Sequence, residues 1–182
     1  MLRVILFDLG DTLIQERVDD VTKLDAMTLH VRPHARAVLK RLSHRYRIGV
    51  VTDTETSSEA SVRAALRNVG LAPFISAVVT STDAGVTKPH RAMFLAALRQ
   101  LGAKPSEAIM VGNDPERDIQ GARRLGITSV LYRPSKDYRR AAESGADYVI
   151  DSLEQVIEIA DRLGTCRDVA ADRNPVSSLS VR

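Results

Sequence analysis

Aromatic residues make up only 4% of the 182 residues, and tryptophan is absent. Proteins that bind single-stranded nucleic acid stack the bases on exposed aromatic side chains. The formal net charge of +3 comes from basic and acidic side chains that are scattered along the chain. Both observations argue against a nucleic-acid partner. The mild positive charge favours a small anionic ligand slightly over a nucleic acid.

Cysteine occurs once, at position 166. A single cysteine excludes an internal disulfide and a cysteine-rich zinc site, and it favours a reducing cytoplasm as the location. The apolar run that follows Met1 has about six residues, too few for the apolar region of a signal peptide or for a bilayer span. We therefore expect a cytoplasmic protein with no membrane partner.

Hydrophobic residues make up 44% of the chain and fall in two alternating patterns. Short apolar runs predict strands at residues 4–7, 46–51, 75–80, 108–111, 128–132 and 148–150. Stretches with helical spacing predict six helices. The first starts at Pro33, the second follows Thr56 and ends at Gly70, and the others cover residues 91–101, 116–125, 136–144 and 153–163. Strict alternation predicts a doubly wound, mostly parallel sheet between two helical layers, an α/β fold of three layers.

The length fits a single domain, which we place at residues 1–163. Within it, residues 14–31 are polar and irregular and predict a flap or a minimal cap loop. Residues 164–182 show no clear periodicity and predict a flexible tail. About twenty residues precede the first helix and are too few for a helical cap, whose helices average about 11 residues each. We expect no sizeable cap domain.

Two helix starts carry the spacing of a capping box. Thr56 is followed by Glu59, and Ser152 is followed by Gln155. A hydroxyl with an acid or amide three residues later can satisfy the first free N–H groups of a helix. We expect Thr56 and Ser152 to cap the helices that follow them.

The chain is organised around its first strand, which ends abruptly at Asp8 beside a Gly10 turn. In open α/β sheets, ligands bind at the carboxyl ends of the strands. A carboxylate held there suits a nucleophile or a metal ligand, whereas the simpler interpretation is an aspartate that caps a turn.

Polar residues also end the following strands, and they fit phosphoryl chemistry. The series consists of Asp8 and Asp11, Thr52 and Asp53, Lys88, and then Asn113, Asp114 and Asp118. Carboxylate and amide oxygens are ligands that Mg²⁺ prefers. A hydroxyl and a lysine can bind phosphoryl oxygens, and the lysine offsets developing negative charge.

Each of these residues taken alone has an ordinary structural explanation. Thr52 could be a strand-end hydroxyl, Lys88 a solvated loop lysine, and Asp114 the cap of a helix that begins at Pro115. Their joint occurrence at one edge of successive strands favours a functional site.

In order along the chain, four segments resemble the motifs of the haloacid dehalogenase-like superfamily of phosphohydrolases. They are residues 7–13 (Phe-Asp-Leu-Gly-Asp-Thr-Leu), residues 50–52 (Val-Val-Thr), Lys88-Pro89 with Phe94, and residues 111–126, which contain Gly112-Asn113 and Asp118-Ile119. The resemblance implies that Asp8 is the nucleophile and a ligand of Mg²⁺. It implies that Thr52 and Lys88 bind phosphate, with Asp53 and Gly10 beside them, and that the carbonyl of Gly10 ligates the metal. Asp118 matches the second acid of the last motif.

Two positions depart from the family pattern. Family phosphatases usually have Asp followed by Gly two residues after the nucleophile, and that Asp acts as general acid and base. Here the order is Gly10-Asp11. General acid–base help is worth about 10²–10⁴-fold, so its loss predicts a slow phosphatase unless Asp11 substitutes. Asn113 occupies the position of the first acid of the last motif, so Asn113, Asp114 and Asp118 remain alternatives for the metal.

The resemblance implies a Mg²⁺-dependent phosphohydrolase that cleaves a phosphate monoester through an aspartyl-phosphate. The alternative is a catalytically impaired relative that binds a phosphorylated ligand or partner, and Gly10 is its main support. Because the site is expected to be open, the substrate is either a phosphorylated small molecule or a bulky phosphorylated molecule. Open members of the family also gain a lid by oligomerising, so a homo-oligomer is a further expectation.

Overall fold

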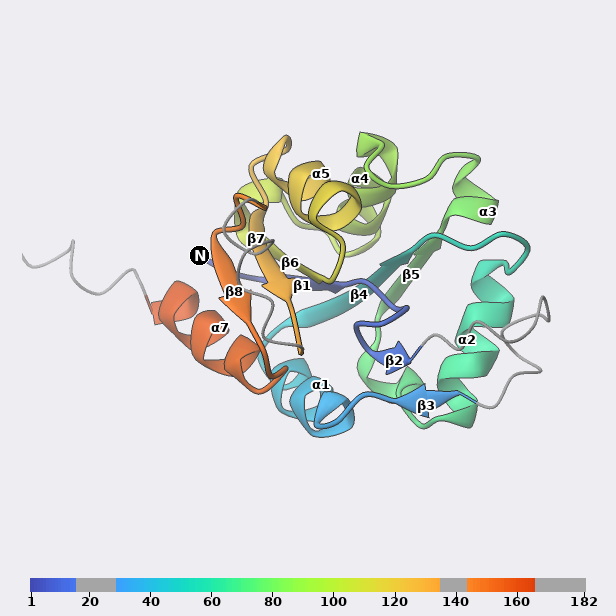
Figure 1. The fold of residues 1–182 in the computed structure, drawn as a ribbon, viewed down its shortest axis with the longest axis horizontal. Coiled ribbons are helices and arrows are strands. Elements are labelled where there is room, and N and C mark those ends of the chain that lie inside the picture. Colours follow the sequence, from blue (N-terminus) through green and yellow to red (C-terminus); the bar gives the residue numbers. More distant parts are fainter. Residues whose placement is uncertain (16–28, 135–143, 166–182) are drawn as a thin grey trace, which may run out of the picture.

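A six-stranded parallel sheet forms the centre of the molecule in a computed structural model, which describes residues 1–15, 29–134 and 144–165 (Figure 1). The strand order is β5-β4-β1-β6-β7-β8. Their bounds are β1 Val4–Phe7, β4 Arg47–Thr52, β5 Ala77–Thr80, β6 Ala108–Gly112, β7 Thr128–Tyr132 and β8 Tyr148–Ile150. Helices cover both faces, so the predicted three-layer, doubly wound α/β fold is confirmed.

The two helical layers follow from the alternation of side chains along β1. Ile5 and Phe7 face the layer made by α1 (Ala35–Ser43), α2 (Glu59–Asn68) and α7 (Gln155–Thr165). Val4 and Leu6 face the layer made by α4 (Arg91–Gln100) and α5 (Gly121–Arg123). All four side chains are fully buried. Strands buried on both faces need such continuous apolar runs, which explains why the sequence signal for β1 is so clear.

Strand register brings the ends of three strands to one edge of the sheet. Phe7 pairs with Val50 of β4 on one side and with Val111 of β6 on the other. The residues that follow these positions therefore leave the sheet at the same height. This register places Asp8 between the ends of β4 and β6, as expected from parallel strands.

A small antiparallel hairpin lies beyond β1. Ile14 of β2 (Ile14–Gln15) pairs with Val31 of β3 (His30–Val31). Residues 16–28 lie outside the described part of the chain. The flap at 14–31 and the division into a domain and a tail stay predictions, and so does the helix at 136–144, where residues 135–143 are not described.

Several boundaries differ from the sequence-based expectation. Ser58, not Thr56, caps α2, and its hydroxyl accepts a hydrogen bond from the N–H of Ser61 at 3.4 Å. The expected loop after β5 begins with the short helix α3 (Ser81–Ala84), because the Thr80 hydroxyl caps it.

The helix expected at 116–125 divides into a wide π-helical turn, η4 (Pro115–Gln120), and α5. Helix α7 passes through Gly164, which was expected to end it. The other short turns are η2 (Ala72–Phe74) and η3 (Pro105–Glu107).

The side chains of Ser152 and Gln155 both accept hydrogen bonds from backbone N–H groups at the start of α7. The Gln155 side chain accepts the N–H groups of Asp151 and Ser152 at 3.0 Å, and the Ser152 hydroxyl accepts the N–H of Glu154 at 3.3 Å. The Gln155 half of the expected capping box is confirmed, whereas the Ser152 hydroxyl accepts the N–H of Glu154 and not that of Gln155.

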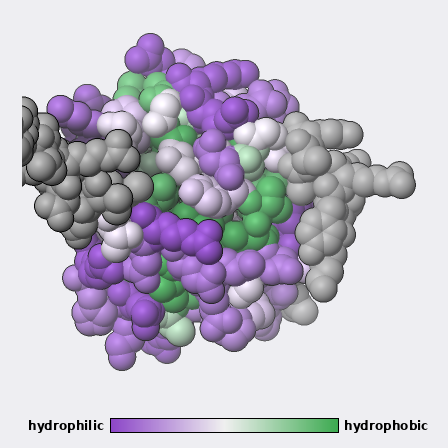
Figure 2. Space-filling view, turned by 90° about the vertical axis from the view of Figure 1, so that its left-hand side faces the viewer, coloured by the Kyte–Doolittle hydropathy of each residue, from purple (hydrophilic) through white to green (hydrophobic). Residues whose placement is uncertain are grey.

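The face of the molecule seen in Figure 2 is mostly hydrophilic, with hydrophobic side chains visible in patches near its middle. The large hydrophobic side chains that are exposed within the described residues are Met1 and Val149. No helix in that part of the chain is long and apolar enough to cross a membrane.

Candidate active site

Asp8 is held in a fixed orientation at the end of β1. Its backbone N–H donates to the carbonyl of Val111 at 2.9 Å, which continues the pairing between β1 and β6. One carboxylate oxygen accepts the ammonium of Lys88 at 2.6 Å, and the other accepts the hydroxyl of Thr12 at 3.0 Å. Asp8 is only 6% exposed. A buried carboxylate with both oxygens held in this way is pre-organised for reaction.

Lys88 lies between two buried carboxylates. Its ammonium donates to Asp8 at 2.6 Å and to Asp118 at 2.8 Å. Burial alone lowers the pKa of Lys88, but the negative charges of Asp8 and Asp118 outweigh it and hold this pKa above its usual value. The loop that carries Lys88 is fixed by its own N–H, which donates to Asp53 at 2.9 Å. Lys88 is therefore cationic across the physiological range.

Asp118 reaches the site through the wide turn η4. One of its oxygens binds Lys88, and the other accepts the N–H of Asp114 at 3.0 Å. Burial raises the pKa of the Asp118 carboxyl to about 6, the charge of Asp8 acts in the same direction, and Lys88 opposes both. π-helical turns of this kind are frequent at functional sites.

These groups surround a small polar cavity of about 60 Å³. Its walls are formed by Asp8, Gly10, Thr52, Asp53, Lys88, Asn113, Asp114, Arg117 and Asp118. Every site residue expected from the sequence is in this set except Asp11. The Thr52 hydroxyl is buried in the wall and donates a long hydrogen bond of 3.5 Å to the carbonyl of Asp53.

Asp11 lies next to the cavity wall but takes part in a different contact. Its carboxylate accepts a hydrogen bond from Arg32 at 2.5 Å, and its side chain is 41% exposed. The backbone of Asp11 is left-handed, with φ of 53°. This conformation favours glycine, and it coincides with the position where the family pattern has glycine. The role of Asp11 as a proton donor stays a prediction.

The candidate metal ligands differ in what they already bind. Asp114 caps η4 by accepting the N–H groups of Glu116 and Arg117, and its other oxygen accepts the Arg117 side chain at 3.0 Å. Burial alone raises the pKa of Asp114, but these hydrogen bonds outweigh it and lower the pKa. Asn113 keeps its amide oxygen near the hydroxyl of Thr12 at 3.3 Å. The amide oxygen of Asn113 is therefore more available to bind a cation than the carboxylate of Asp114.

The donor set fits a magnesium ion. Two buried carboxylates face one lysine, so the centre carries an excess of negative charge that a cation would neutralise. An amide oxygen and a backbone carbonyl complete a set of hard oxygen donors. Among the described residues no group of three or more His, Cys, Asp or Glu side chains is placed to hold a metal ion together.

Two residues of the site were missed at the sequence level. Thr12 is fully buried and its single hydroxyl proton lies near both Asp8 and Asn113. Arg117 lines the cavity mouth, lies 3.6 Å from Asp53 and binds Asp114. Thr12 lies in the segment that carries the first motif, so it could have been predicted from the sequence as a site residue. Arg117 could not, because its partners Asp53 and Asp114 come together only in the folded chain.

Gly112 lets Asp118 approach β6, which leads to a first prediction. A Cβ atom at position 112 would overlap with the carboxylate of Asp118. We expect Gly112→Ala to displace Asp118, to destabilise the protein by about 1–3 kcal/mol and to reduce any turnover at least tenfold. Urea unfolding of the single variants and of the Gly112→Ala/Asp118→Gly double variant measures the coupling, because the overlap includes the Cβ atom of Asp118 as well as its carboxylate. If the changes in the free energy of unfolding at positions 112 and 118 simply add in the double variant, the overlap between the two residues does not contribute to the destabilisation.

Lys88 leads to a second prediction. We expect Lys88→Met to lose about 3–5 kcal/mol of stability without metal, because two buried carboxylates lose their counter-ion. Added Mg²⁺ should raise the melting temperature of the variant more than that of the wild type. The exposed Lys40→Met change is the matched control. Equal responses of both variants to Mg²⁺ would contradict this account of the centre.

The same variant should respond to pH. A carboxyl whose pKa is raised in the folded state stabilises the fold at low pH and loses that contribution as pH rises through the folded value. The pKa of Asp118 is already about 6 with Lys88 present. Metal-free Lys88→Met should therefore lose stability between pH 5 and pH 8 more steeply than the wild type, as thermal unfolding at each pH would measure.

The sequence and the fold agree on the family. The family model described as "Haloacid dehalogenase-like hydrolase" matches residues 8–132, which is more than half of the chain. The protein belongs to the haloacid dehalogenase-like hydrolase family. The match begins at Asp8 and ends with the last residue of β7.

Individual relatives include named phosphatases. The chain is 34% identical over 135 residues to the ribulose-1,5-bisphosphate 5-phosphatase of Halopiger xanaduensis, covering 70% of this chain and 55% of that protein. It is 35% identical over 133 residues to the glyceraldehyde 3-phosphate phosphatase of Pyrococcus furiosus, covering 71% and 54%. The chain thus spans about half the length of the curated relatives it matches. Among solved structures, an uncharacterized protein from Listeria monocytogenes serotype 4b has a TM-score of 0.77 at 26% identity, covering 90% of this chain and 99% of that one.

Proposed function

We propose that the protein is a Mg²⁺-dependent phosphohydrolase that cleaves a phosphate monoester through an aspartyl-phosphate on Asp8. The observation that carries the proposal is the contact of Lys88 with both Asp8 and Asp118 inside a polar cavity that Thr52 also lines. A structural ion pair would need no cavity beside it. The names of the relatives support phosphate esters as the substrate class.

The chemistry follows from these residues. A carboxylate oxygen of Asp8 attacks phosphorus, the bond from phosphorus to the leaving oxygen breaks, and that oxygen takes up a proton. Lys88 and the Thr52 hydroxyl bind the phosphoryl oxygens as charge moves onto them. Water then attacks phosphorus, releases phosphate and restores the Asp8 carboxylate. Thr12 keeps Asp8 aligned by its hydrogen bond through both steps.

Magnesium has a definite place in this proposal. Asp8, Asp118, Asn113 and the carbonyl of Gly10 would hold it. When bound, the ion offsets the repulsion between a carboxylate and a charged phosphoryl group. Without it, the excess negative charge around Lys88 opposes the entry of a phosphate.

Proton transfer is the weak part of the proposed mechanism. Gly10 has no side chain to protonate the leaving oxygen or to activate water, and Asp11 binds Arg32. We therefore propose slow turnover, with esters of acidic alcohols cleaved faster than esters of ordinary alcohols, because an acidic leaving group needs less protonation.

The same observation favours a second candidate function, a catalytically impaired protein that binds a phosphorylated ligand. Lys88 and Thr52 would still bind phosphate in that case. Hydrolysis of p-nitrophenyl phosphate and of a panel of phosphate esters distinguishes the two functions, with ribulose 1,5-bisphosphate and glyceraldehyde 3-phosphate included because of the relatives. If the protein is a phosphohydrolase, turnover should require Mg²⁺ and should stop when the metal is chelated. Binding of phosphate esters without turnover across the panel would leave only the second function.

A further inference from the structure

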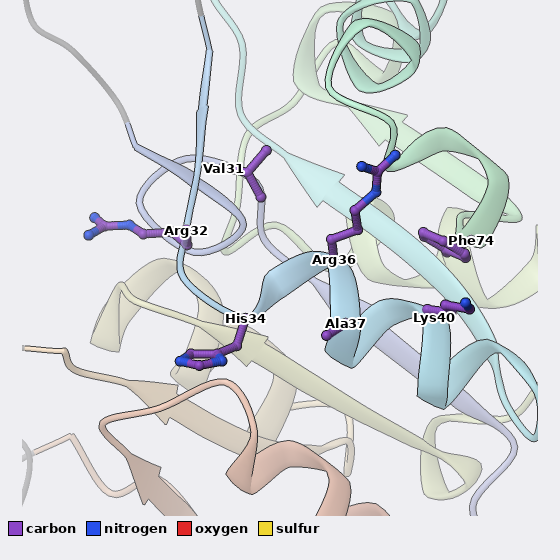
Figure 3. Close-up of a pocket in the computed structure, with 7 residues that line it drawn as sticks. All are labelled: Val31, Arg32, His34, Arg36, Ala37, Lys40 and Phe74. Atoms are coloured by element: carbon purple, nitrogen blue, oxygen red, sulfur yellow. The ribbon is translucent and has the colours of Figure 1, made fainter.

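A second pocket lies between β3, helix α1 and the turn η2. It has a volume of about 650 Å³, within the range of small-molecule sites. Helix α1 forms one wall, β3 and the turn η2 form the others, and Figure 3 shows the side chains that line it. No residue is shared between its lining and that of the catalytic cavity.

The lining combines positive charge with apolar walls. The polar members are basic, namely Arg32, His34, Arg36 and Lys40, and no acidic residue of the described part of the chain lines the pocket. Val31 and the ring of Phe74 supply apolar surface. This composition fits an anion that carries an apolar or aromatic body.

Two of these four basic side chains are already engaged by acidic residues and two are not. Arg32 binds Asp11, and His34 lies 3.3 Å from Glu154. Within the described parts of the chain, the Arg36 and Lys40 side chains make no hydrogen bond or ion pair. Figure 3 shows both leaving neighbouring turns of α1 on the side of Phe74, whereas Arg32 and His34 extend toward the other end of the pocket.

The placement of these two cations is unfavourable for the free protein. Arg36 and Lys40 are four residues apart on α1, and like charges at that spacing repel each other. Arg36 also lies in the first turn of α1, which contains no acidic residue, where the helix dipole disfavours a positive charge. A bound anion would relieve both effects.

Gly70 helps to hold Arg36 in this position. Gly70 ends α2 with a left-handed backbone, φ of 69°, and the guanidinium of Arg36 occupies the space that a Cβ atom there would take. The cation is therefore placed against the wall of the pocket before any ligand arrives.

We propose that this pocket is a second binding site, which takes a small organic phosphate with an apolar or aromatic body. Arg36 and Lys40 bind the phosphate, and the body of the ligand lies against Val31 and Phe74. The site is independent of the proposed phosphatase chemistry at Asp8.

Calorimetric titration with adenosine 5′-monophosphate in metal-free buffer tests the proposal. The wild type should bind it at least tenfold more tightly than either adenosine, which lacks the charge, or inorganic phosphate, which lacks the body. Arg36→Gln/Lys40→Gln should lose at least tenfold in affinity. Arg41→Gln, which removes a charge from α1 outside the pocket, should bind within twofold of the wild type.

Two further measurements separate this site from the catalytic cavity. Thr52→Val, which removes a hydroxyl from the wall of the catalytic cavity and keeps the ion pairs of Lys88, should bind adenosine 5′-monophosphate as the wild type does. Arg36→Gln/Lys40→Gln should keep the wild-type response to Mg²⁺ in thermal unfolding. The proposal is overturned if the wild type shows no binding at millimolar nucleotide, if the double variant binds as tightly as Arg41→Gln, or if Thr52→Val abolishes binding.

Discussion

Asp8→Asn should abolish turnover of every phosphate ester that the wild type hydrolyses. The amide has the size of the carboxylate but is a poor nucleophile, so the covalent step has no attacking group. We expect a loss of at least about 10³-fold, within the range seen when a nucleophile is removed. Steady-state hydrolysis of p-nitrophenyl phosphate at saturating Mg²⁺ measures it.

Folding must be separated from chemistry in this comparison. Asp8 is buried and bound to Lys88, so the change also alters an ion pair. Melting temperatures of both proteins give the structural effect directly. Asp53→Asn is the matched control for folding, since it changes another carboxylate in the cavity wall, one that accepts the backbone N–H of Lys88 and makes no hydrogen bond to its ammonium. Turnover by Asp8→Asn within tenfold of the turnover of the wild type would contradict the nucleophilic role.

Restoring the family order at positions 10 and 11 should increase activity. The double change Gly10→Asp/Asp11→Gly places a carboxylate on the residue that lines the cavity and a glycine at the left-handed position. We expect kcat/KM for alkyl phosphates to rise by about 10²–10⁴-fold, because their leaving oxygen must be protonated. For p-nitrophenyl phosphate kcat/KM should change only a few-fold, because its leaving group departs without a proton.

The same double change has a structural cost and benefit that can be measured. Glycine at position 11 removes the strain of a side chain at φ of 53°, whereas the ion pair with Arg32 is lost. Arg32→Gln alone, which loses only the ion pair, controls for that effect and should leave kcat/KM for alkyl phosphates within a few-fold of the wild type. If the double variant gains nothing with alkyl phosphates, Gly10 is not the reason for slow turnover.

The positions of the strand ends could be predicted because their signals are local. Each core strand is a short apolar run that stops at a polar residue, and parallel pairing then brings those stops to one edge. Asp8, Thr52, Lys88 and Asp118 could be assigned to one site for that reason, and the structure places them around one cavity.

Other features depend on contacts between distant residues and could not be predicted. Asp11 could be placed near the site but not assigned to Arg32, since the hairpin that brings them together has no strong sequence signal. Thr56 and Ser58 are both good cap residues, and only the path of the backbone decides between them. The second pocket forms only because η2 lies beside α1 in the folded chain. Nothing in the sequence of either segment predicts that the two are neighbours.

Detection of the covalent intermediate tests the central claim most directly. With p-nitrophenyl phosphate the first step needs no proton, whereas hydrolysis of the aspartyl-phosphate needs an activated water, so the intermediate should accumulate in the wild type. Acid quenching of the reaction with ³²P-labelled substrate, followed by peptide mapping, should find the label on the peptide that contains Asp8, sensitive to hydroxylamine and absent from Asp8→Asn. Label on another residue, or turnover with no labelled protein at any time, would contradict the account.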